Sequence, residues 1–138
     1  MDTAQNRMDR LLDAALPNVA FDGWSESTFK AAVKASDIDM AEARMLAPRG
    51  ALDLAVAHHR RGDARMLERL AETDLSALRF RDRVATALKI RLDVTDDKEA
   101  VRRASALFSL PHNAAEGAKL IWKTADHIWT ALGETSDD

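Results

Sequence analysis

The sequence predicts an all-α protein, and three observations indicate this fold class. Apolar residues recur three and four positions apart along most of the chain, as on the buried face of a helix. Alternating strand patterns are missing, and so is tyrosine. The prolines Pro17, Pro48 and Pro111 lie where each can end a helix. We therefore expect about seven helices in one domain, residues 1–138.

The first three expected helices form a head that covers residues 1–48. The first helix spans residues 4–15, and we expect Pro17 to end it because proline cannot continue the helical hydrogen bonding. Ser25 is the expected N-cap of the second helix, since its hydroxyl can accept a hydrogen bond from a backbone N–H of the first turn. The third helix is short, begins after Asp39 and ends before Pro48.

Four longer helices are expected to form the body, residues 49–138. Gly62 lies in the middle of the first of them and should weaken it by roughly 1 kcal/mol relative to alanine. We expect Asp96 to begin the third and Asn113 the fourth, each followed three residues later by a glutamate. The expected ranges are 49–72, 76–93, 96–111 and 113–132.

The head resembles a TetR-type helix-turn-helix in the layout of residues 24–56. Two short helices are separated by S-D-I, and P-R-G then leads into a long helix. Residues 22–50 hold four basic and five acidic residues, a balance of −1, whereas DNA binding draws most of its affinity from cations that neutralise phosphates. We therefore expect no nucleic-acid partner. A TetR-type regulator with a small apolar ligand pocket remains the alternative.

Few residues of the chain are suited to catalysis. Cysteine is absent, and neither a glycine-rich phosphate loop nor a G-x-S-x-G motif occurs. His58 and His59 diverge by about 100° on a helix and cannot chelate one metal together. His59 falls on an apolar stripe, which fits a hydrogen-bonded core or interface histidine better than a ligand. These observations predict a protein that is not an enzyme and that holds no metal and no cofactor.

Two surfaces are candidates for binding. Residues 79–91 hold five basic side chains, among them Arg79 and Arg83, which fit either a solvated helix face or a site for anionic lipid headgroups or an acidic partner. Trp122 and Trp129 lie one heptad apart on one flank of the last helix. They fit either the core or an apolar cavity or docking surface, and we expect Trp129 to be the closer of the two to function.

Several motifs together resemble the ubiquinone-biosynthesis accessory proteins of the Coq-nine family. The most specific are F-D-G-W-S and the combination of L-P-H-N with D-x-I-W and G-[DE]-x-S. Softer matches are P-R-G followed by D-L, and an R-x-R-x-x-x-A-L-x-x-R-L run. In this chain the motifs occupy residues 21–25, 48–50, 53–54, 81–92, 110–113, 126–129 and 133–136. Family members continue with an aromatic-rich motif and further helices, which we expect this chain to lack.

The resemblance implies a TetR-like fold and a non-catalytic role. Proteins of the family bind isoprenoid and other lipids and assist the di-iron hydroxylase that acts on demethoxyubiquinone. The implied partners are thus an isoprenoid, quinone or phospholipid, this hydroxylase and a membrane surface. A homodimer, the identity of the lipid and the oligomeric state stay open. The implied location is cytoplasmic, peripheral to the inner membrane of a bacterium, or on the matrix side in a mitochondrion. The expected lipid-lining residues are Leu67, Leu70, Val84, Leu88, Leu107, Ile121 and Ile128.

Overall fold

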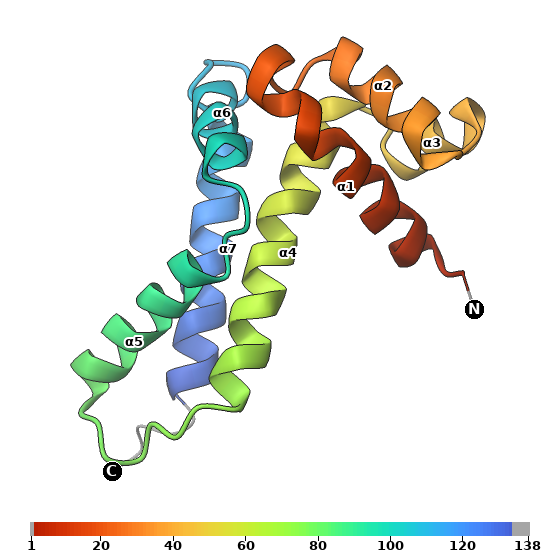
Figure 1. The fold of residues 1–138 in the computed structure, drawn as a ribbon. Coiled ribbons are helices and arrows are strands. Elements are labelled where there is room, and N and C mark those ends of the chain that lie inside the picture. Colours follow the sequence, from red (N-terminus) through yellow and green to blue (C-terminus); the bar gives the residue numbers. More distant parts are fainter. Residues whose placement is uncertain (1, 134–138) are drawn as a thin grey trace.

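The computed structural model describes residues 2–133 and confirms the all-α class. Within these residues the chain forms seven helices and no strand (Figure 1). Every expected helix is present, although several boundaries differ from the expectation. The helices are α1 (Ala4–Asp22), α2 (Glu26–Ser36), α3 (Met40–Leu46), α4 (Ala51–Ala71), α5 (Phe80–Asp93), α6 (Lys98–Phe108) and α7 (Ala114–Gly133).

Helix α1 continues through Pro17, so the prediction that this proline ends the helix was wrong. A proline inside a helix gives up one backbone hydrogen bond at a cost of about 3 kcal/mol. The fully buried side chains of Ala15 and Val19 lie on either side of it, and their burial offsets that cost. The helix ends at Gly23, whose φ of 66° is the left-handed conformation that glycine adopts without strain.

The head packs around one hydrophobic cluster that α1, α2, α3 and the first half of α4 share. Phe29 and Leu54 are among its fully buried members. Ser25 caps α2 as predicted, since its hydroxyl accepts a hydrogen bond from the Thr28 backbone N–H at 3.2 Å. Trp24 donates its indole N–H to the Ala100 carbonyl of α6 at 3.0 Å, which ties the head to the body.

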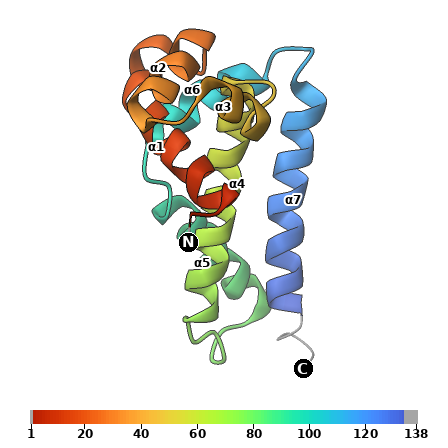
Figure 2. The same cartoon turned by 90° about the vertical axis from the view of Figure 1, so that its right-hand side faces the viewer.

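The body is built along α4: α7 runs beside most of its length, and α5 packs beside its C-terminal half (Figures 1 and 2). These three helices share a second hydrophobic cluster that includes Met66, Ile90 and Leu132. Helix α6 turns back to the head and packs on α1. Helices α5 and α6 both contact α7 as well as α4.

Helices α5 and α6 of the body begin later than expected. Helix α5 begins at Phe80, not at residue 76, because residues 74–78 form turns in which the Asp74 carboxylate accepts hydrogen bonds from Ser76. Helix α6 is capped by Asp97, whose carboxylate accepts from the Ala100 N–H at 2.9 Å. The predicted cap, Asp96, binds side chains of α4 instead.

Gly62 has a packing role that its helix-weakening effect does not reveal. The guanidinium of Arg91 on α5 lies directly over this glycine, and a Cβ built on Gly62 would be 2.5 Å from the guanidinium carbon. Helices α4 and α5 can therefore cross with an arginine between them only where α4 has no side chain.

We expect the Gly62→Ala substitution to destabilise the protein by about 1–3 kcal/mol, because the new methyl group displaces the Arg91 side chain. At an ordinary helix position the same change would stabilise the protein by roughly 1 kcal/mol. Urea unfolding measures the free energy of each variant. Ala64→Gly, at an exposed position two residues away, calibrates the helix propensity in this segment. A more stable Gly62→Ala variant would contradict the packing role.

Candidate functional site

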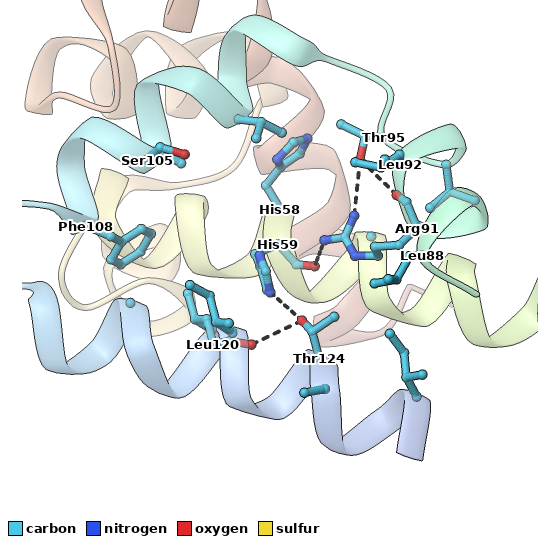
Figure 3. A pocket seen from close by; sticks show the side chains of 18 of the residues that line it. His58, His59, Leu88, Arg91, Leu92, Thr95, Ser105, Phe108, Leu120 and Thr124 are labelled. Carbon is cyan, nitrogen blue, oxygen red and sulfur yellow. Dashed lines mark hydrogen bonds between the residues drawn. The ribbon is translucent and has the colours of Figure 1, made fainter. Parts of the chain in front are cut away.

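An open groove of about 920 Å³ runs between α4, α5, α6 and α7 (Figure 3). Helix α4 contributes mainly polar side chains to its lining, among them His58, His59 and Arg65, whereas α5, α6 and α7 contribute most of the apolar ones. Its apolar lining residues are Ala55, Phe80, Val84, Leu88, Leu92, Val94, Val101, Ala104, Phe108, Ala114, Ala118, Leu120, Ile121, Ala125, Ile128 and Trp129.

The groove leaves large apolar side chains in contact with water. Ile121 is 69% exposed and Trp129 is 66% exposed, although both line the groove. Trp129 meets Phe80 edge to face with 5.8 Å between ring centroids, so these two rings form one end of the groove. A contiguous apolar surface of this kind marks a site for an apolar ligand or partner.

The two tryptophans of α7 differ in their relation to the groove. Trp122 is 75% exposed and does not line the groove, whereas Trp129 does. The alternative that both belong to the core is therefore wrong. This placement agrees with the expectation that Trp129 is the closer of the two to a binding site.

Four of the seven predicted lipid-lining residues meet in the groove: Val84, Leu88, Ile121 and Ile128. They come from α5 and α7, where the apolar stripe of the sequence coincides with the face that the fold leaves open.

The other three predicted residues lie elsewhere, so the expectation for them was wrong. Leu67 and Leu70 line a second, smaller hollow of about 550 Å³ beside the turns after α4. Along α4 they come after Arg65, the last residue of this helix that lines the groove. Leu107 packs against the hydrophobic cluster of the head, while its neighbour Phe108 lines the groove.

A buried polar cluster lies beneath the middle of the groove. The Asp63 carboxylate, only 3% exposed, accepts a hydrogen bond from Arg91 Nε at 2.8 Å and one from the Thr124 hydroxyl at 2.9 Å. Thr124 also lies 2.8 Å from His59 Nε2. Arg91, Thr124 and His59 line the groove (Figure 3), whereas Asp63 does not. We name these four residues the polar cluster.

Sequence reasoning missed three members of this cluster. His59 and Asp63 are four residues apart and so share one helix face, and Thr124 interrupts the apolar stripe of α7. These two signals together could have pointed to a polar contact between α4 and α7. Arg91 was counted only among the basic side chains of residues 79–91, because its place in the polar cluster depends on how α5 crosses Gly62.

Burial lowers the pKa of both histidines of α4. For His59 the neighbouring Asp63 carboxylate opposes this effect, and for His58 a hydrogen bond to Asp96 does so, but burial is the larger influence on each pKa. Both imidazoles are therefore neutral at physiological pH. The His58 Nε2 lies 3.1 Å from the Asp96 carboxylate, and its ring packs 5.9 Å from the Trp24 ring.

The basic surface predicted on residues 79–91 is smaller than expected. Arg79 is exposed, but Arg83 is buried and donates from Nε to the carbonyls of Leu75 and Leu78. The prediction that Arg83 belongs to a partner or lipid surface was therefore wrong. The reason is that the turns before α5 present backbone carbonyls, and the long Arg83 side chain folds back to satisfy them.

The arginines of the head are engaged in ion pairs. Arg44 pairs with Glu26 and lies 4.5 Å from the centre of the Phe29 ring. Arg49 binds Asp53 and Glu116, the latter at 2.7 Å between Nη2 and Oε2. Both arginines of residues 22–50 are therefore bound to carboxylates.

Among residues 2–133, no three histidine or acidic side chains come together as a metal site requires. No helix within the same range combines the length and the apolar character needed to cross a membrane. Residues 134–136, which belong to the G-[DE]-x-S motif of the family resemblance, lie outside the part of the chain that the structure describes.

Comparisons with known proteins do not assign a family. No protein-family model matches this chain, and none of the curated proteins matches it.

Proposed function

We propose that this chain is a non-catalytic lipid-binding protein that holds an apolar tail in the groove between α4 and α7. The observation that carries the proposal is the open groove, whose lining is mainly aliphatic and aromatic although several of its residues are exposed. Transfer of one CH₂ group from water to such a surface gains about 0.8 kcal/mol. A long isoprenoid or acyl tail could therefore gain enough in this groove to compete with a membrane.

We propose, from the resemblance to the Coq-nine family, that the chain assists a demethoxyubiquinone hydroxylase. In this role it presents an isoprenoid or quinone lipid to the di-iron enzyme at a membrane surface. The open side of the groove supports the proposal, because a lipid held there stays accessible to a second protein. The exposed Trp129 at one end of the groove provides an apolar surface for such a contact.

The one pair of groups that resembles catalytic machinery has an arrangement that favours structure over hydrolysis. A nucleophile and its base would be Thr124 and His59, 2.8 Å apart. In a catalytic triad the carboxylate orients the histidine from its other nitrogen. Here the Asp63 carboxylate binds the threonine hydroxyl itself, and its distance to His59 Nε2 is 3.8 Å. This geometry holds the hydroxyl in place instead of activating it.

The decisive experiment compares Trp129→Ala with Trp122→Ala. The two residues are of one type, lie on one helix and are similarly exposed, but only Trp129 lines the groove. We expect Trp129→Ala to weaken the binding of decanol, measured by calorimetry, by about tenfold, or roughly 1.4 kcal/mol. Trp122→Ala should change the affinity by less than about twofold, which is under about 0.5 kcal/mol.

The same two variants test the accessory role. Turnover of the hydroxylase on substrate embedded in vesicles should rise when the chain is added, and Trp129→Ala should remove more of this rise than Trp122→Ala. Equal effects of the two substitutions on both measurements would contradict the proposed site. A wild-type protein that binds no decanol would contradict lipid binding altogether.

A further inference from the structure

The groove carries a polar feature that tail binding alone does not require. His59, Arg91 and Thr124 of the polar cluster line the groove together with aliphatic side chains of α5 and α7 (Figure 3), and the buried Asp63 carboxylate binds Arg91 and Thr124. Burial of such groups is costly unless each finds a hydrogen-bond partner. Polar atoms of a ligand are therefore suited to the part of the cluster that lines the groove.

The hydrogen bonds within the cluster determine the tautomer of His59. The Thr124 hydroxyl has one proton and lies 2.9 Å from both oxygens of the Asp63 carboxylate, the strongest acceptor near it. The hydroxyl oxygen therefore accepts from His59 Nε2, which must carry the imidazole proton. In this tautomer Nδ1 carries no proton and can act only as an acceptor.

Arg91 adds donor capacity to the same part of the groove. Its guanidinium donates to the Asp63 carboxylate, to Thr95 Oγ1 at 3.2 Å and to the His59 carbonyl at 3.0 Å. A guanidinium has five N–H groups, so these three bonds leave capacity for two more. A carbonyl or hydroxyl oxygen of a ligand is a suitable acceptor.

The charges that line the groove are already neutralised by the protein. Each of the three lining arginines has a carboxylate partner: Arg91 binds Asp63 at 2.8 Å, Arg61 binds Asp13 at 2.7 Å, and Arg65 binds Asp96 at 2.9 Å. A carboxylate or phosphate of a ligand would have to compete with these partners and would meet no excess positive charge.

We propose that the polar cluster is a head-group subsite, selective for lipids whose head is uncharged and carries hydroxyl or carbonyl oxygens. The inference rests on the proposed lipid-binding function and adds the chemical class of the head. The tail of such a lipid extends from the cluster toward Phe80 and Trp129, where the groove is apolar. Fatty acids and anionic phospholipids are the disfavoured class.

The test uses three probes that share one tail: decanol, decanoate and decyl phosphate, each titrated at neutral pH and followed by calorimetry. We expect the wild-type protein to bind decanol about tenfold more tightly than either anion. Thr124→Val and His59→Phe each keep the shape of the side chain and remove its hydrogen-bonding groups. Each should reduce this preference to about twofold or less.

Matched controls separate a local effect from a general one. Thr130→Val, on the exposed side of α7, and His112→Phe, in the turn before α7, change the same residue types outside the groove and should keep the preference. Thermal melts of all four variants identify any that fail to fold. If one groove variant does not fold, the other still decides the outcome.

The possible outcomes distinguish this inference from the proposed function. Equal affinity for all three probes, or preference for an anion, overturns the head-group subsite and leaves lipid binding intact. Binding of none of the probes overturns both. An affinity that falls as the protein concentration rises indicates a second copy of the chain in the groove, which also overturns the subsite.

Discussion

The Asp63→Ala substitution is expected to lower the free energy of unfolding by about 3–5 kcal/mol, the usual cost of removing one partner of a buried ion pair. Asp63 is almost fully buried, and its carboxylate accepts from Arg91 Nε and from the Thr124 hydroxyl. Without it, the Arg91 guanidinium stays between α4 and α5 with no counter-charge. Because the cluster joins α4, α5 and α7, the whole body should lose stability. Urea unfolding followed by circular dichroism measures this change.

Two further variants test the cause of this loss. Asp126→Ala removes an exposed aspartate from α7 and should change stability by no more than about 0.5 kcal/mol. The double variant Asp63→Ala with Arg91→Met removes the unpaired charge and should recover much of the loss. If Asp63→Ala unfolds at the same urea concentration as Asp126→Ala, the ion pair contributes nothing to stability.

The Phe29→Ala substitution should destabilise the protein by about 3–5 kcal/mol, because it removes a large side chain from a closed core. Phe29 is completely buried in the hydrophobic cluster of the head, and the Arg44 guanidinium covers its ring. Truncation leaves a cavity beneath α2 that neighbouring side chains can fill only in part. Thermal and urea unfolding report the loss.

Phe21→Ala is the matched control for this experiment. Phe21 lies in the same head, near the end of α1, but is 83% exposed, so its loss should change stability by about 0.5 kcal/mol or less. Similar losses for the two substitutions would show that Phe21 is buried in solution, for example against another molecule. A small loss for Phe29 would contradict the packing of the head.

The sequence alone determined the helical class and the existence of all seven helices. Caps such as Ser25, and stripes of apolar residues such as those around Ile121 and Ile128, act within a few turns of one helix. Hydrogen bonds from residue i to i−4 and a single buried face are local properties, so a local pattern predicts them. For the same reason Val84 and Leu88 were placed correctly in the groove.

The tertiary structure alone decided which local signals were overridden. Helix α1 continues through Pro17 because buried neighbours compensate for the missing hydrogen bond. Gly62 lies within a helix because Arg91 of another helix needs the space, and Arg83 is buried because the turns before α5 present carbonyls to it. Asp96 binds side chains of α4 and does not cap α6. In each case the residues that decide the outcome are distant in sequence or belong to a turn. The burial or hydrogen bonding that they supply exceeds the small free energy by which a residue favours or disfavours a helix.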